Sequence, residues 1–226
     1  MAMITLHHLE YSQSFRILWL LEELGVDYEL KSYDRDKDTY LAPPDYKALS
    51  PLAAAPVIEH GDLVLAESSA IIDYVLDLHP SDALRPPPGA PNRARHLFWF
   101  HAAQGSMMPI MLVDSVFRII GGRAPFFAKP ILSPVFKQTT AAFLKPRMNA
   151  LLAVAEQDLA SAPWFGGEDL TAADIALCYS MEAASARGYI TDAHRNCRAW
   201  LQRMRDRPSF QAAKARDGRD TMVLPL

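Results

Sequence analysis

The segment Ala55–Leu78, APVIEHGDLVLAESSAIIDYVLDL, decides the fold of this 226-residue chain. Pro56 opens an apolar run, and His60–Asp62 is a turn sequence between two short strands. We therefore expect a hairpin built from Val57–Ile58 and Leu63–Leu65. Because proline cannot donate to a sheet ladder, it leaves the strand-like backbone before it free, most of all if its own peptide bond is cis.

A helix is expected directly after the hairpin. Glu67 and Ser68 supply the acid and the hydroxyl that are favoured in a first helical turn. The apolar residues that follow recur near helical spacing: Ile71, Ile72, Val75, Leu76 and Leu78. A helix start presents unpaired N–H groups that suit the carboxylate of a small ligand, although an ordinary capped helix would carry the same residues. A free backbone beside such a start could hold a peptide.

This pattern resembles the amino-terminal, thioredoxin-like domain of the glutathione transferase family. The resemblance implies that Pro56 is a cis-proline and that the Ala55 backbone pairs with the cysteinyl unit of glutathione. It also implies that Glu67 and Ser68 hold the γ-glutamyl end. Glutathione would then be a co-substrate of the protein.

The rest of the amino-terminal region agrees with this resemblance. We expect strands at Met3–His7 and Tyr28–Tyr33, a helix at Phe15–Leu24 with Gly25 as its C-cap, and a short helix at Ala42–Leu49. The order is then β-α-β-α-β-β-α. The first helix is apolar around most of its circumference, so more than its own sheet must cover it. The charged loop Asp34–Asp38 is typical of a solvated edge.

Composition predicts two domains. Residues 81–91 are rich in proline and form a semi-rigid linker. Residues 1–80 are expected to be the α/β thioredoxin-like domain, and residues 92–226 an all-α domain, because no strand-like alternation continues beyond the linker. Within the second domain, Thr171 and Asp174 are spaced as a helix capping box with a structural role, like those in the helical domain of the family.

The thiol-activating hydroxyl is expected between the first strand and the first helix. In serine-type members of the family it stands four or five residues before an arginine, which here is Arg16. That count gives Ser12 or Tyr11, and Ser12 is the residue type expected there. Ser14 is the better candidate for the helix cap. The segment Leu9–Arg16 has no cysteine, which disfavours a cysteine-based disulfide exchange.

One departure from the family lies just before Pro56. Many relatives carry a lysine there that meets the glycyl carboxylate, whereas this chain has Ala53-Ala54-Ala55. Tyr40, Lys37 or Lys47 could take its place, and the sequence does not choose among them.

The pocket for the electrophile is expected in the second domain, where an apolar, adaptable surface is available. The candidates are Trp99, Phe100, Met107, Met108 and Met111. A stripe of aromatic and methionine side chains is more often plain core, so both interpretations stay open.

Charge and composition exclude other classes of protein. The net charge of −3 and the lack of a long basic run argue against nucleic-acid binding. No signal peptide is evident, and no apolar run approaches the roughly 18 residues that span a bilayer, so we expect a cytoplasmic protein without membrane partners. Cys178 and Cys197 have no metal-ligand spacing, and the His7-His8 pair points to opposite strand faces, so no metal is assigned.

The resemblance implies a homodimeric glutathione transferase of detoxifying type that adds the glutathione thiolate to small hydrophobic electrophiles, and the composition predicts that it is cytoplasmic. Two alternatives remain. One is a protein that binds glutathione or hydrophobic ligands without turnover, supported by the missing lysine. The other is a glutathione-dependent disulfide reductase or isomerase.

Overall fold

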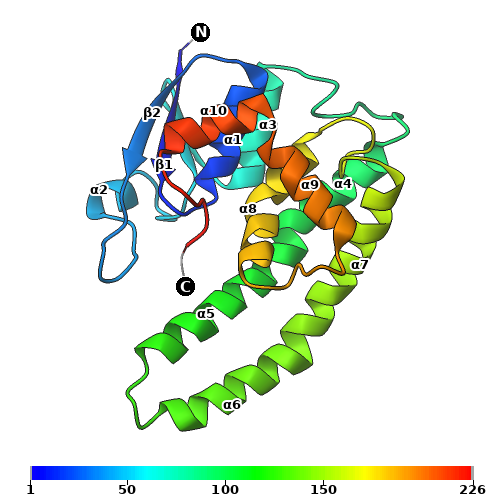
Figure 1. Cartoon of the computed structure of the whole chain (residues 1–226). Coiled ribbons are helices and arrows are strands. Elements are labelled where there is room, and N and C mark those ends of the chain that lie inside the picture. The colour runs from blue at the N-terminus through cyan, green and yellow to red at the C-terminus, as the bar shows by residue number, and fades with distance from the viewer. Residues whose placement is uncertain (1, 225–226) are drawn as a thin grey trace.

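The amino-terminal domain has the expected order of elements. The structure is a computed structural model that describes residues 2–224. The elements of this domain are β1 (Ile4–Leu9), α1 (Ser14–Leu24), β2 (Tyr28–Tyr33), α2 (Pro44–Lys47), β3 (Val57–His60), β4 (Leu63–Ala66) and α3 (Ser68–Leu78). The predicted β-α-β-α-β-β-α arrangement is confirmed, and Figure 1 shows helices packed on this sheet.

The four strands form one mixed sheet in the order β2-β1-β3-β4. β1 runs parallel to β2, as a β-α-β crossover requires, and antiparallel to β3. The predicted hairpin pairs β3 with β4 around Gly61, whose φ of 61° is one that glycine adopts without steric cost. The Ala55–Pro56 peptide bond is cis, as the resemblance implied.

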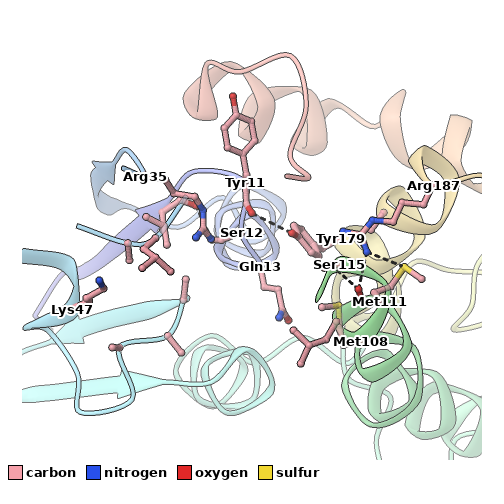
Figure 2. A pocket seen from close by; sticks show the side chains of 18 residues that line it. Tyr11, Ser12, Gln13, Arg35, Lys47, Met108, Met111, Ser115, Tyr179 and Arg187 are labelled. Carbon is pink, nitrogen blue, oxygen red and sulfur yellow. Dashed lines mark hydrogen bonds between the residues drawn. The ribbon is translucent and has the colours of Figure 1, made fainter. Parts of the chain in front are cut away.

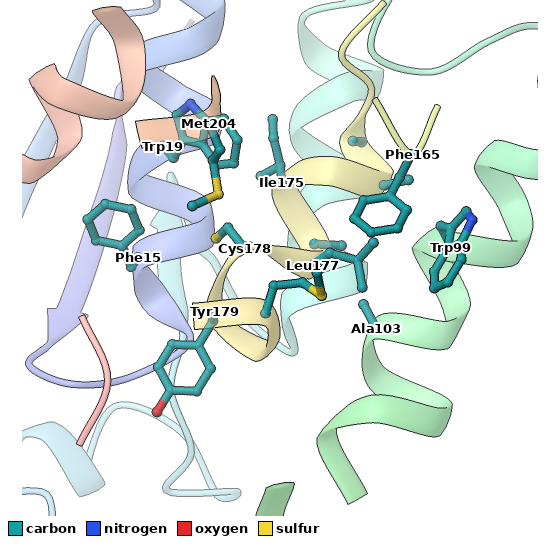
Figure 3. Packing of buried hydrophobic residues seen from close by; sticks show 14 of the residues in the cluster. Phe15, Trp19, Trp99, Ala103, Phe165, Ile175, Leu177, Cys178, Tyr179 and Met204 are labelled. Atoms are coloured by element: carbon teal, nitrogen blue, oxygen red, sulfur yellow. The ribbon is translucent and has the colours of Figure 1, made fainter. Parts of the chain in front are cut away.

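Helix α1 is covered on several sides, as its apolar circumference predicted. It contacts α3 within its own domain, and α8 (Ala172–Ala186) and α10 (Pro208–Asp217) of the helical domain. The Trp19 ring meets Phe210 of α10 edge-on at 5.3 Å between centroids. Figure 3 shows Phe15 and Trp19 on one side of α8 and Trp99 on the other. The two domains therefore share one continuous hydrophobic core.

All the regular elements assigned after α3 in the described chain are helices or helical turns. No helix or strand is assigned between Leu78 and Arg93, where the linker was expected. The other elements of this half are α4 (Arg93–Ala102), a π-helical turn at Ala103–Met107, α5 (Met108–Arg123), α6 (Lys129–Thr139), a second π-helical turn at Thr140–Leu144, α7 (Lys145–Ser161) and α9 (Arg195–Arg205), with α8 and α10 given above. In Figure 1, α5 and α6 extend away from the body of the molecule as an arm.

The helix Arg93–Arg123, which joins α4, the first π-helical turn and α5, is long and apolar enough to cross a membrane by length and composition alone. Its apolar residues do not form one uninterrupted run, because His101, Gln104 and Ser106 lie among them. A core helix of a soluble protein passes the same test. Here Trp99 and Phe100 are buried and α4 packs against α8, so part of this helix has a core role.

The predicted capping box at the start of α8 is confirmed. Thr171 Oγ1 accepts the Ala173 amide, and the Asp174 carboxylate accepts the Thr171 amide at 3.0 Å. Asp174 is fully buried and also accepts the Trp200 indole N–H at 2.8 Å. The box therefore joins α8 to α9 as well as starting a helix.

Candidate active site

A cavity of about 330 Å³ lies between the two domains. The loop after β1, the segment before β3 and the loop before α2 form one side of it, and helices α5 and α8 form the other (Figure 2). Its lining residues are Leu9, Tyr11, Ser12, Gln13, Arg35, Leu41, Ala42, Lys47, Ala53, Ala54, Ala55, Met108, Met111, Leu112, Ser115, Tyr179, Ala183 and Arg187. The volume is within the range of small-molecule sites.

Strand register brings Ala55 to this cavity. β1 and β3 are antiparallel with His7 opposite Val57, so continuing the pairing by two residues places Ala55 beside Leu9. Tyr11 and Ser12 follow Leu9 in the loop that leads into α1. Three of the predicted site residues, Ala55, Tyr11 and Ser12, therefore lie at one cavity, beside the end of β1 and the start of β3.

The other three predicted residues, Pro56, Glu67 and Ser68, are not among the residues that line this cavity. Pro56 follows Ala55, and extending the β3–β4 register by one residue places Glu67 beside Pro56. Glu67 has φ 77° and ψ 120°, a backbone conformation that costs a non-glycine residue of order 1–3 kcal/mol and is frequent at ligand sites. Ser68, 2% exposed, begins α3.

Ser12 is buried, with only 5% of its surface exposed. Its hydroxyl lies 2.7 Å from the Leu9 carbonyl and 2.7 Å from the Ser14 hydroxyl, and it accepts the Ser14 amide at 3.2 Å. The prediction that Ser14 caps α1 is wrong. Helix α1 begins at Ser14 itself, and the Ser14 hydroxyl contacts His8 and the Leu9 amide.

Tyr11 is placed differently from Ser12. Its backbone adopts φ 49°, and its carbonyl accepts a hydrogen bond from the Tyr179 hydroxyl at 3.2 Å. Figure 2 shows the Tyr11 ring directed away from Met108 and Gln13, toward the carboxyl-terminal part of the chain. The phenol therefore faces away from the centre of the cavity.

Three cations line the cavity, and no aspartate or glutamate is among its lining residues in the described chain. Lys47 comes from α2, and Arg187 follows α8.

Arg35 donates through Nε to the Glu10 carbonyl and through Nη1 to the Tyr40 carbonyl, both at 2.9 Å. Burial lowers the pKa of Arg35, while Tyr179 and Glu10 oppose that change. The loop Asp34–Asp38 is thus part of the site, which corrects its interpretation as a plain solvated edge.

Of the three side chains suggested as substitutes for the missing lysine, Lys47 alone lines the cavity. Arg35, Gln13, Tyr179 and Arg187 were not predicted from sequence. A fourth cation, Arg16, is fully buried and donates a hydrogen bond to the side chain of Gln13, which lines the cavity. Burial lowers the pKa of Arg16 to about 10, so its guanidinium stays charged at neutral pH.

The apolar side of the cavity comes from α5. Met108, Met111 and Leu112 line it, so two of the five predicted pocket residues are at the site. Trp99, Phe100 and Met107 are each at most 3% exposed and belong to the core. The Trp99 indole also donates to the Asp158 carboxylate at 2.7 Å, which fixes it within the helical domain.

Neither cysteine is at the cavity. Both are buried, and burial raises the pKa of Cys178 to about 12 and raises that of Cys197 as well. Among residues 2–224 no group of three or more His, Cys, Asp or Glu side chains is placed to hold a metal ion.

Comparison with known proteins identifies the family. The model for "Glutathione S-transferase, N-terminal domain" matches residues 1–77, and that for the C-terminal domain matches residues 114–208. The chain is 31% identical over 223 residues to glutathione S-transferase 3 of Schizosaccharomyces pombe, covering 98% of this chain and 91% of that protein. The chain belongs to the glutathione S-transferase family.

Solved structures agree with this membership. A glutathione S-transferase from Actinobacillus pleuropneumoniae has a TM-score of 0.78 at 32% identity, covering 96% of this chain and 93% of that one. A glutathione transferase homologue from Sulfitobacter, solved with bound glutathione, has a TM-score of 0.73 at 25% identity, covering 96% and 99%. The α/β thioredoxin-like domain followed by an all-α domain is thus the glutathione S-transferase fold.

Proposed function

We propose that this glutathione transferase binds glutathione in the cavity described above and presents the thiolate to small hydrophobic electrophiles. The observation that carries the proposal is the charge of the cavity: Arg35, Lys47 and Arg187 line it without a carboxylate among the described lining residues. Glutathione has two carboxylates and one ammonium group, so it is an anion at neutral pH, and it gains a further negative charge as the thiolate. A cavity of this charge attracts and holds that anion.

Ser12 is the hydroxyl proposed to meet the sulfur. It lies at the start of α1, where the helix dipole favours negative charge, and the Tyr11 ring is turned away. A free cysteine thiol has a pKa of about 8.5, and lowering it by two units requires about 2.7 kcal/mol. A hydrogen bond to a charged group contributes roughly 1.5–3 kcal/mol, so one serine suffices.

The electrophile is proposed to lie against Met108, Met111 and Leu112. These side chains face the same cavity as Ser12 and come from a different domain. Methionine adapts its shape to irregular apolar ligands, which suits a site that accepts several of them. Ala55 and Pro56 are proposed to hold the cysteinyl unit, and Glu67 and Ser68 the γ-glutamyl end, with Lys47 in the role of the missing lysine.

A titration of the bound thiol tests this proposal. Ultraviolet absorbance of the thiolate is followed against pH in complexes of wild type, Ser12→Ala and Tyr11→Phe. We expect a lowered pKa in wild type and in Tyr11→Phe, and a rise of one to two units in Ser12→Ala. A wild-type complex that titrates like free glutathione would remove the mechanism, whereas a rise in Tyr11→Phe alone would move the role to Tyr11.

Activity assays separate the alternative functions. A chloronitrobenzene reports conjugation, a mixed disulfide reports reduction, and glutathione binding without either reports a carrier. Conjugation is expected to dominate, because Lys47 at the cavity weakens the argument from the missing lysine. No cysteine lines the cavity within residues 2–224, so a disulfide would have to be reduced by glutathione's own thiol.

A cytoplasmic homodimer is proposed as the working form. The arm of α5 and α6 exposes large apolar side chains, with Phe126 86% and Ile131 71% exposed. Surfaces of this kind on soluble proteins usually meet a partner, and here a second copy is proposed. Light scattering coupled to gel filtration should give twice the chain mass, and a monomer would contradict the proposal.

A further inference from the structure

Four side chains form a continuous buried hydrogen-bonded chain that starts at the cavity. The Ser12 hydroxyl lies 2.7 Å from the Ser14 hydroxyl, which lies 2.8 Å from His8 Nδ1. The other ring nitrogen, His8 Nε2, lies 2.8 Å from a carboxylate oxygen of Asp217. All four residues are at most 5% exposed. Asp217 is the last residue of α10, which returns to pack on α1 (Figure 1).

The protonation state of His8 decides where the Ser12 proton points. Each hydroxyl has one proton to donate. When His8 is neutral with its proton on Nε2, Ser14 donates to Nδ1, and Ser12 donates to Ser14 or to the Leu9 carbonyl. When both ring nitrogens are protonated, Nδ1 donates to Ser14, and Ser14 turns its proton to Ser12 or to Leu9 at 3.1 Å. Ser14 Oγ, which also accepts the Leu9 amide, then no longer accepts from Ser12, so the Ser12 proton is shared between the Leu9 carbonyl and an acceptor in the cavity.

We propose that Ser14, His8 and Asp217 form a proton relay that takes up the proton of bound glutathione and turns the Ser12 hydroxyl toward the sulfur. This inference rests on the proposed function, in which Ser12 meets the thiol. Ser12 is the residue that touches the substrate, and the other three are positioning residues that act through it.

The protons balance at every step of the relay. The S–H bond of glutathione breaks, and its proton passes to Ser12 Oγ. The former Ser12 proton moves to Ser14 Oγ, and the former Ser14 proton moves to His8 Nδ1. The result is a thiolate that accepts a hydrogen bond from Ser12, and an imidazolium paired with the Asp217 carboxylate. When the conjugate leaves, the proton returns along the same chain to water that enters the cavity.

Two cations lie near the Asp217 carboxylate at the far end of this hydrogen-bonded chain. Lys214 Nζ lies 3.7 Å from one carboxylate oxygen, and Arg219 Nη1 lies 3.4 Å from the other. Arg219 is itself paired with Glu10 and Asp34 at the ends of β1 and β2. Helix α1 contributes the Ser14 hydroxyl, which lies beside the His8 ring. The Asp217 carboxylate, 2.8 Å from His8 Nε2, is placed to pair with an imidazolium at His8.

The test measures the bound thiol in variants that interrupt the relay away from the cavity. The variants are Ser14→Ala and Asp217→Asn, and the matched control is His96→Asn, which alters another buried histidine. Each relay variant should raise the pKa of bound glutathione by about one unit and lower kcat near pH 6.5 about tenfold, with KM for glutathione within about twofold of wild type. The control should titrate like wild type.

The outcomes separate the relay from the proposed function. If Ser12→Ala raises the thiol pKa while both relay variants titrate like wild type, the relay is wrong and the proposed function stands. If Ser12→Ala leaves the thiol pKa lowered as in wild type, Ser12 is not the donor and the relay through it is wrong. If the wild-type complex titrates like free glutathione, the proposed function itself fails.

A measurement on the unaltered enzyme covers the case in which a variant does not fold. Nitrogen-15 NMR of the histidines near pH 7 should show His8 becoming doubly protonated when glutathione binds. S-methylglutathione, which has no thiol proton, should leave it neutral. A His8 signal that does not change with glutathione would overturn the relay.

Discussion

The hydroxyl of Tyr179 in α8 donates a 3.2 Å hydrogen bond to the backbone carbonyl of Tyr11, so the helical domain holds the loop that carries Ser12. Tyr179 is 9% exposed, and burial raises the pKa of its hydroxyl, which therefore remains a proton donor at neutral pH. The position of the proposed thiol-activating serine thus depends on contact between the two domains.

Tyr179→Phe removes this one hydrogen bond and keeps the ring. A neutral hydrogen bond is worth roughly 0.5–1.5 kcal/mol, so kcat/KM should fall about 2- to 10-fold. Steady-state kinetics with a chloronitrobenzene measures the change. Tyr74→Phe is the control, because the Tyr74 hydroxyl is hydrogen-bonded to His60, at the end of β3 away from Ala55. Equal losses in both variants would show that the Tyr179 contact has no special role.

Lys47→Met should weaken glutathione binding. Lys47 is an exposed residue at the cavity rim, so its attraction for a carboxylate is screened and worth about 1 kcal/mol, or roughly a fivefold rise in KM for glutathione. The effect should shrink as salt is added. Lys37→Met, which changes a lysine outside the cavity lining, should leave KM unchanged. A larger effect at Lys37 than at Lys47 would reassign the glycyl carboxylate.

Asp174→Ala should be among the most destabilising substitutions in the chain. The carboxylate accepts the amides of Phe165 and Thr171 and the Trp200 indole, all buried, and removing it leaves these donors without partners. A loss of about 3–5 kcal/mol in the free energy of unfolding is expected.

Urea denaturation measures the effect at Asp174. Asp169→Ala, an exposed acid in the preceding loop, should change the unfolding free energy by less than about 0.5 kcal/mol. A loss below about 1 kcal/mol at Asp174 would contradict the role assigned to its carboxylate.

His96 should make the protein less stable in acid. Burial lowers its pKa to about 4, with repulsion from Arg93, His101 and Arg85 adding to the effect. An unfolded histidine has a pKa of about 6.5, so the unfolded state binds the proton first as the pH falls. Stability from this group is complete above about pH 6.5 and declines toward pH 4, by an amount on the order of 3 kcal/mol.

His96→Asn should flatten this decline relative to wild type. Urea denaturation at several pH values between 4.5 and 7 measures it, and His79→Asn, which changes a half-buried histidine that is not among the groups acting on His96, should keep the wild-type slope. Parallel curves for wild type and His96→Asn would show that His96 is not held neutral.

The elements with local signals were predictable from sequence. The Gly61 turn, the proline before β3 and the helical spacing after Glu67 act within a few residues, so the hairpin and α3 follow from them directly. The role of Arg35 could not be predicted, because a charged loop looks solvated until the Glu10 and Tyr40 carbonyls are placed around it. The choice of Lys47 over Lys37 likewise required the position of α2.

The assignment of Ser14 failed for a physical reason. The first apolar residue of the helix is Phe15, which suggests Ser14 as the cap, but the helix begins one residue earlier and the hydroxyl turns inward to His8. The hydrogen bonds that start at Ser14 continue through His8 to Asp217. No local sequence pattern signals a contact between residues so far apart.

The pairing of His8 with Asp217 spans 209 residues and has a consequence for timing during synthesis. At typical elongation rates of 5–20 residues per second, roughly 10–40 s separate the moments at which these two residues are added. During that interval the nascent chain can build its sheet and the loop that carries Ser12, but the His8 imidazole does not yet have the Asp217 carboxylate beside it. Thiol activation through His8 would then become possible only after Asp217 has been added, so the amino-terminal domain can fold before it holds a reactive thiolate.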